Sequence, residues 1–229
     1  MTLFTKIVAP ALFALSASIA GAATVTEVID LRGNGGLDTS YDYTSSAGMG
    51  VTATGHYLNS DGSIGTQALI GQYSHGLGVT TADTRTRCRH SSRSCYSSDE
   101  HYVDSYGPDE VVQFAFDSAV SISRIYFSYV SSWDDFSFSV ISSGGGVMSF
   151  NGDLDILGHS YGYYDFSGPL AISSIFGIGA AGYGDYFKIA ALEVIWEEET
   201  PAVPLPASAL LMIGAFGTFG ALRRRRKAA

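Results

Sequence analysis

The chain lacks most of what marks an intracellular enzyme. Charged residues make up only 15% of its 229 positions, and cysteine occurs twice. Its five histidines do not form an H-E-x-x-H motif, and it contains neither a G-x-S-x-G turn nor a phosphate-binding P-loop. The sequence signatures of zinc proteases, α/β-hydrolases and P-loop enzymes are therefore missing.

Helical periodicity is also missing between Ala23 and Thr200. Short segments there alternate apolar and polar residues, which is typical of strands with one buried face. The alternating apolar positions are Val112, Phe114 and Phe116; Ile125, Phe127 and Tyr129; Phe136, Phe138 and Val140; and Leu192, Val194 and Trp196. Glycine-rich breaks separate them at residues 107–108, 144–146, 151–152, 168–169 and 182–184. We therefore predict an all-β fold, an antiparallel β-sandwich of jelly-roll-like type, with a hairpin at residues 144–146.

Basic residues are scarce in the same central region. Residues 27–199 contain 22 acidic and seven basic side chains, a formal charge of −15, whereas the whole chain carries −9. Such a domain repels phosphate backbones, so we expect no nucleic-acid partner. It is suited to binding cations, or to staying soluble through self-repulsion.

The N-terminus has the pattern of an export signal. Lys6 precedes an apolar run over residues 7–20, and Ala20, Gly21 and Ala22 form an A-x-A-like cleavage site. We predict that residues 1–22 are a signal helix, cleaved after Ala22 or Ala23. A buried N-terminal helix or a membrane anchor is the alternative, although the stretch is short for a span.

The C-terminus has the pattern of a membrane span. Residues 203–222 are uncharged and about long enough to cross a bilayer, and a basic cluster over residues 223–227 follows, which would stay cytoplasmic. We predict a transmembrane helix in residues 201–229 and an extracytoplasmic domain in residues 23–200.

The tail also resembles a known sorting signal. Its motif, apolar helix and arginine cluster, in this order, resemble the VPLPA variant of the PEP-CTERM signal of Gram-negative bacteria that make extracellular polysaccharide. The resemblance implies processing by an exosortase, an inner-membrane intermediate, and then a cell-surface or secreted protein. The motif residues are Val203, Pro204, Leu205, Pro206 and Ala207, and the orienting residues are Arg223, Arg224, Arg225 and Arg226. An ordinary single-span anchor is the alternative.

A second resemblance covers residues 51–141. GLGV at residues 76–79, HYVDSYGPDEVVQFAF at 101–116 and the segment at 122–140 resemble ectodomains that are repeatedly attached to PEP-CTERM tails. This resemblance implies no enzymatic activity.

Three carboxylates stand close together around Gly107-Pro108. Asp104, Asp109 and Glu110 could converge on one centre, and calcium prefers several oxygen ligands. The spacing does not match an EF-hand loop. Turn capping by Asp104, with the other two solvated at a strand start, explains the same residues.

Two further acidic pairs deserve comparison with known chemistry. Asp134 and Asp135 follow Trp133, but glycoside hydrolysis needs two carboxylates at a set separation, and neighbours in a strand point to opposite faces. A polar loop is the simpler interpretation. Asp153 and Asp155 flank Leu154 and form a second cation candidate.

Cys88 and Cys95 are the only cysteines. In an exported protein such a pair is expected to form a disulfide, worth about 2–3 kcal/mol in the chain-entropy model. A zinc site with His90 lacks a fourth ligand and the usual spacing.

Two clusters suggest polysaccharide contact. Arginines at 85, 87, 89 and 93 would suit anionic groups, although a solvated loop is the simpler interpretation. Aromatic side chains near His159 could stack on sugar rings or pack in the sheet, and these are Tyr161, Tyr163, Tyr164 and Phe166.

These features rank the possible functions. We expect first a non-enzymatic surface or matrix protein that is sorted by its tail and associated with extracellular polysaccharide, with no cofactor. The second possibility is a calcium-dependent carbohydrate-binding module. The third is a secreted hydrolase, which requires catalytic groups that meet in a pocket.

Overall fold

The fold is known from a computed structural model that describes residues 22–80, 87–88, 95–96, 101–167, 171–180, 182 and 184–198. A compact unit extends from Thr24 to Glu197. The described part contains strands and no helix, so the predicted all-β class is confirmed. No helix in this part is long and apolar enough to cross a membrane. The predicted signal helix and transmembrane helix lie outside the described residues.

Fifteen strands follow one another along the chain. They are β1 (Ala23–Asp30), β2 (Gly36–Asp38), β3 (Tyr41–Thr44), β4 (Gly50–Leu58), β5 (Ile64–Tyr73), β6 (Gly76–Thr80), β7 (Arg87–Cys88), β8 (Cys95–Tyr96), β9 (Val103–Asp104), β10 (Glu110–Val130), β11 (Asp135–Ile141), β12 (Val147–Asp155), β13 (Leu157–Asp165), β14 (Ser173–Gly179) and β15 (Tyr186–Glu198).

The strands pair in the order β1-β15-β6-β5-β4-β10-β14-β11-β12, and β10 also pairs with β15. The pairings therefore close a circuit through β15, β6, β5, β4 and β10. Each pairing whose register is described is antiparallel, as the sequence predicts. The glycine-rich turn at residues 144–146 joins β11 to β12, which confirms the predicted hairpin.

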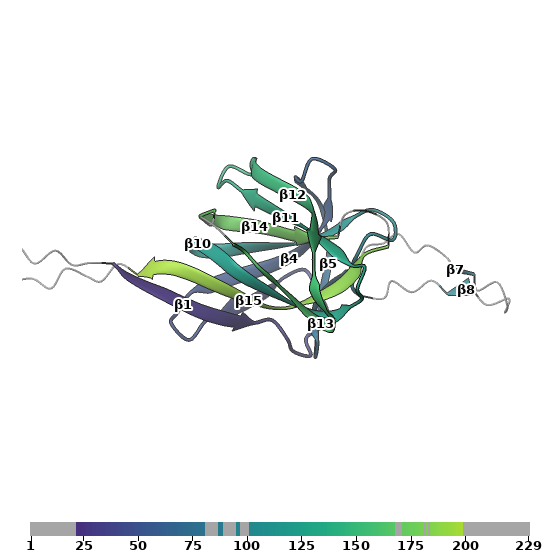
Figure 1. Ribbon diagram of the computed structural model, residues 1–229, viewed down its shortest axis with the longest axis horizontal. Helices are drawn as coiled ribbons and strands as arrows, with labels where there is room; N and C mark the ends of the chain where they lie inside the picture. The colour runs from purple at the N-terminus through teal and green to yellow at the C-terminus, as the bar shows by residue number, and fades with distance from the viewer. Residues whose placement is uncertain are drawn as a thin grey trace, which may run out of the picture. The chain divides into compact units, whose positions relative to one another are not determined.

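Strand β10 has 21 residues and belongs to two layers (Figure 1). Its first half pairs with β4 and β14, and its second half pairs with β13 and β15. The exposed residues Asp117, Ser118 and Ala119 mark the change, where the register with β14 also shifts. The sequence predicts two separate strands here, whereas the chain runs on as one strand from layer to layer.

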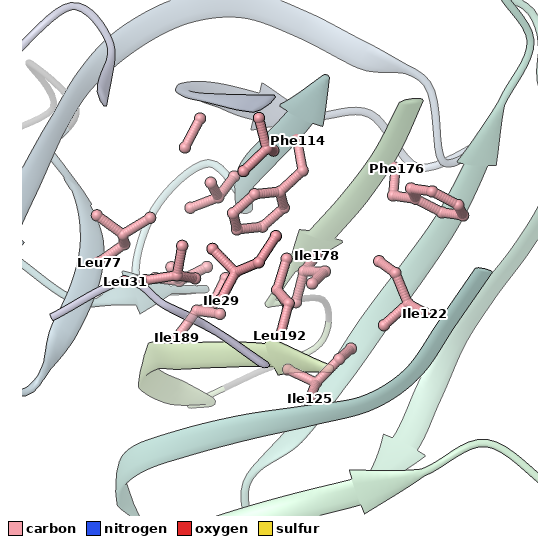
Figure 2. Close-up of a cluster of buried hydrophobic side chains, with 14 of the residues drawn as sticks. Ile29, Leu31, Leu77, Phe114, Ile122, Ile125, Phe176, Ile178, Ile189 and Leu192 are labelled. Carbon is pink, nitrogen blue, oxygen red and sulfur yellow. The ribbon is translucent and has the colours of Figure 1, made fainter. Parts of the chain in front are cut away.

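The core lies between these layers and comes from strands throughout the domain. Figure 2 shows Ile29, Leu77, Phe114, Ile178 and Leu192, which approach one another from different strands. The predicted inward positions of β10 and β15 are confirmed for Val112, Phe114, Phe116, Ile125, Phe127, Leu192, Val194 and Trp196, all of which are buried. Apolar burial of this extent is the main stabilising term of such a fold.

Aromatic rings continue this core along β11. Phe136 lies 5.0 Å from both Phe127 and Tyr164, and Phe138 lies 4.6 Å from Phe166, measured between ring centroids. Offset and edge-to-face contacts of this kind add to the free energy of burial. The predicted shared face of Phe136 and Phe138 is thus confirmed.

Two local predictions for this layer are wrong. Ser137 and Ser139 are buried, because the Ser137 hydroxyl donates to the Gly179 carbonyl and the Ser139 hydroxyl donates to the Gly62 carbonyl of the β4–β5 turn. Asn151-Gly152 does not separate strands. It lies inside β12, next to a shift in the register with β11.

The first and last strands of the domain are neighbours. β1 pairs with β15, and the Leu31 amide donates to the Ala190 carbonyl at 3.0 Å. The two strands run in opposite directions, so the start of β1 and the end of β15 lie at the same end of the domain (Figure 1). The start of β15, at Tyr186, lies at the opposite end, which we call the distal end.

Candidate functional site

The outer face of β13, β10 and β15 carries an exposed row of tyrosines. Tyr163 lies opposite Tyr126, and Tyr161 lies opposite Ser128. Tyr161 is 67% exposed and Tyr163 is 41% exposed, whereas the alternate residues of both strands point into the core. We call Arg124, Tyr126, Tyr161 and Tyr163 the tyrosine strip.

Arg124 holds this strip together. Its guanidinium lies 5.6 Å from the ring centroid of Tyr126 and 5.3 Å from that of Tyr163, within the range of cation–π attraction. Its Nε donates to the carboxylate of Asp165, the cross-strand partner of Arg124. This hydrogen bond and that with the Tyr126 hydroxyl raise the pKa of Arg124. The cation is therefore neutralised in place, and the rings are oriented beside it.

The structure divides the aromatic group predicted around His159. Tyr161 and Tyr163 face solvent, while Tyr164 and Phe166 pack against the core. His159 is exposed, and its Nδ1 lies 3.1 Å from the Ser160 hydroxyl. Only half of the group is thus available to a ligand, because the residues of a strand alternate between faces.

A β-bulge ends the strip at Tyr129. The sequence predicts that Tyr129 is buried beside Ile125 and Phe127, but Tyr129 is 42% exposed and Val130 is buried. The register with β13 shifts between Ser128 and Val130, and Tyr129 adopts a φ of 60°. The bulge turns the ring outward, and a left-handed residue of this kind costs about 1–2 kcal/mol.

Rings from two other segments surround Tyr129. His75, in the β5–β6 turn, lies 4.8 Å from Tyr129, and Tyr102 lies 5.4 Å from it. Tyr73 and His101 are stacked at 5.5 Å. We call Tyr73, His75, His101, Tyr102 and Tyr129 the bulge cluster.

Lys188 lies beneath the bulge cluster. Its ammonium is 4.2 Å from the ring centroid of Tyr73 and 4.7 Å from that of Tyr102, and it donates to the carbonyl of His101. The side chain is buried, and a buried ammonium needs partners of this kind. Lys188 therefore fixes the segment around His101 against β15.

Five aspartates gather at the distal end, and we call Asp134, Asp135, Asp153, Asp155 and Asp185 the acid cluster. Asp135 lies opposite Asp155 in the β11–β12 register, and their carboxyl groups share a hydrogen bond. Burial, this bond and repulsion from Asp155, Asp185 and Asp153 raise the pKa of Asp135 to about 6.

The rest of the acid cluster is tied to the backbone. Asp134 is buried and accepts a hydrogen bond from the Ser131 amide at 2.6 Å, so it is not part of a solvated loop. Asp185 is buried and accepts one from the Asp135 amide at 3.2 Å. Burial raises the pKa of Asp185, and repulsion from Asp134, Asp153 and Asp109 adds to the increase.

The three residues predicted for calcium have different surroundings. Asp104 accepts a hydrogen bond from the Tyr106 amide at 2.8 Å, as a turn-capping aspartate does. Glu110 is buried and accepts one from the Asp104 amide at 3.1 Å, so its expected solvation is wrong. Burial raises the pKa of Asp109. Within the described ranges, no three His, Cys, Asp or Glu side chains gather as a metal site.

Close backbone packing explains the GLGV segment. A Cβ on Gly78 would collide with the His101 carbonyl, and one on Gly76 would collide with the Ile189 carbonyl. β6 therefore fits between β15 and the segment around His101 only with glycine at both positions. The resembling motifs around residues 76–79 and 101–110 thus build the frame of the bulge cluster.

The register of β7 and β8 places Cys88 directly opposite Cys95. Opposite residues of an antiparallel pair have Cα atoms about 4.5–5.5 Å apart, which suits a disulfide. The side chains of this pair lie outside the described residues, so the disulfide stays a prediction. The side chains of the arginine group at residues 85–93, and the whole tail, also lie outside them.

Comparisons with known proteins give no relative: no family model, no curated protein and no solved structure matches the chain. The site therefore has to be interpreted from its own geometry.

Proposed function

We propose that the chain is a non-enzymatic exported surface protein that binds extracellular polysaccharide through the tyrosine strip. The observation that carries the proposal is the solvent-facing row of Tyr126, Tyr161 and Tyr163, ordered by Arg124. Flat aromatic rings with a polar edge stack on the apolar face of a sugar ring while their hydroxyls bond its hydroxyls. The finer description of the domain as a jelly-roll-like sandwich belongs to the same proposal.

The position of the strip supports this function. The domain's chain ends leave from one end, and the strip follows β10 toward the distal end. If an exosortase processes the tail at Pro204 and Pro206, the strip lies away from the point of attachment. A polymer outside the cell would then reach it.

Two experiments test the proposal. In affinity electrophoresis through gels with extracellular polysaccharides, the Tyr161→Ala/Tyr163→Ala variant should lose retardation. Met148→Ala, which removes an exposed apolar side chain from β12, should keep it. Equal retardation of all three forms would refute the role of the strip.

The sorting step has its own test. Mass spectrometry of the protein from cells with and without the exosortase should show loss of the C-terminal peptide only when the enzyme is present. An intact tail in both strains would refute the exosortase role.

The acid cluster supports a second candidate, a calcium-dependent carbohydrate-binding module. Repulsion between Asp135, Asp155 and Asp185 would be relieved by a divalent cation. Calcium should then raise the melting temperature, and EGTA should reverse the increase. An unchanged melting temperature would remove this candidate.

A secreted hydrolase has less support. Asp135 and Asp155 share a hydrogen bond, whereas retaining glycosidases hold their carboxyl groups about 5 Å apart and inverting enzymes hold them farther apart.

A further inference from the structure

We infer that the bulge at Tyr129 builds a second sugar subsite, so that one neutral polysaccharide chain lies along β10 from the tyrosine strip to the distal end. The inference rests on the proposed function and names the class of glycan and its path across the surface.

Unusual backbone geometry is concentrated around this subsite. Among the described residues, the non-glycine positions with positive φ are His101, Tyr129 and Ser160. Ser160 lies opposite Val130 at the bulge, and His101 belongs to the bulge cluster. Such conformations persist only where the surroundings enforce them, and they gather at functional sites.

The strain has one visible effect, which is to expose an aromatic ring. A regular strand would bury Tyr129 beside Phe127 and turn Val130 outward. The bulge exchanges the two, and Tyr129 reaches 42% exposure. Burial of apolar surface does not require this exchange, because the larger ring is the one that faces water.

The exposed ring is continuous with the strip. Ser128 lies between Tyr126 and Tyr129 on β10 and opposite Tyr161. Its hydroxyl donates to the His75 carbonyl at 2.6 Å, which brings the β5–β6 turn over β10. His75 and Tyr129 therefore border the strip at its distal end. From Arg124 to Tyr129 the strand spans about 17 Å, enough for several sugar rings in a row.

The charges on this surface favour a neutral glycan. Its two cations already have partners, because Arg124 pairs with Asp165 and Lys188 is buried beneath Tyr73 and Tyr102. Glu193 lies opposite Arg124 on β15 and adds negative charge beside the strip. Residues 27–199 carry a formal charge of −15. A polymer of uronic acids or sulfated sugars would be repelled.

Tyr129→Gly separates a binding role from a structural one. Glycine adopts the positive φ without strain, so the variant removes the ring and keeps the backbone of the bulge. If the ring serves a ligand, the melting temperature should not fall. If the ring only packs against Tyr102 and His75, the variant should be less stable.

The test uses the full chain in mild detergent, with glucan, mannan and xylan as neutral polymers and alginate and polygalacturonate as anionic polymers. At least one neutral polymer should retard the wild type in affinity gels, and neither anionic polymer should. Tyr129→Gly should weaken the neutral interaction about tenfold, while Met148→Ala should not change it.

Each contrary result has a distinct meaning. Undiminished binding by Tyr129→Gly would overturn the subsite and leave the strip intact, and so would a loss of stability that accounts for the loss of binding. Retardation by anionic polymers alone would overturn the neutral class. Retardation by no polymer would refute the proposed function itself.

Discussion

Gly78 packs against the carbonyl group of His101, with no room for a side chain between them. The same carbonyl accepts the ammonium of Lys188, and His101 itself stacks on Tyr73. This contact joins β6, β15 and the segment before β9 in one place. It is the point at which the fold and the bulge cluster depend on each other.

Gly78→Ala is therefore expected to destabilise the protein by about 2–3 kcal/mol, because the added methyl group must displace backbone. Urea unfolding followed by tyrosine fluorescence measures the change. Gly144→Ala is the control, since only the Ser142 hydroxyl lies near its Cβ, at 3.9 Å. Similar midpoints for both variants would show that the contact is not tight.

Stability should depend on the proton shared in the acid cluster. Because the folded-state pKa of Asp135 is raised to about 6, the fold binds a proton there more tightly than the unfolded chain does. Its contribution to stability is therefore full below about pH 4 and is lost as the pH rises through about 6.

Asp135→Asn should accordingly stabilise the protein above pH 6, by about 1 kcal/mol after allowance for solvent screening, and have no such effect at pH 4. Asp117→Asn, outside the acid cluster, is the control. Melting temperatures from pH 4 to 8 measure the effect. A stabilisation that is the same at every pH would contradict the shared proton.

Arg124 should matter more for binding than for stability. It is partly exposed, and an exposed ion pair with Asp165 contributes about 0–1 kcal/mol. Arg124→Lys keeps the charge but loses the planar stacking on Tyr126 and Tyr163. Polysaccharide affinity should fall while the unfolding midpoint changes little. A large loss of stability with unchanged affinity would assign Arg124 a purely structural role.

Cys88 and Cys95 should be found as a disulfide in the exported protein, because the β7–β8 register places them opposite each other. Alkylation without reductant, followed by peptide mass spectrometry, measures this directly. Quantitative alkylation of both thiols before reduction would show that the pair is free.

The sequence was a good guide to faces and a poor guide to neighbours. Alternation correctly predicted the buried side of Phe114 and Leu192, because a strand with one buried face leaves a period of two. It failed at Tyr129, since a single left-handed residue shifts the alternation and leaves no mark in the composition. The polar residues Asp117 and Ser118 suggested a break in β10, where the strand instead changes layers.

The candidate site was recognised only in part for the same reason. Tyr161 and Tyr163 could be selected by their spacing, but their cross-strand partners Tyr126 and Arg124 could not, because pairing across 40 positions is set by the register. The acid cluster shows the same limit. Asp153 and Asp155 are visible as a pair, whereas the approach of Asp185 depends on where β15 begins.

The claim at the centre of this account is that sugar rings lie on the outer face of β10 and β13. The most direct measurement is backbone and aromatic NMR of the protein during titration with the polysaccharide that retards it. The account predicts shifts for Tyr126, Tyr161, Tyr163 and Tyr129 and none for Met148 or Phe150 of β12. Shifts confined to β12, or spread evenly over the domain, would contradict it.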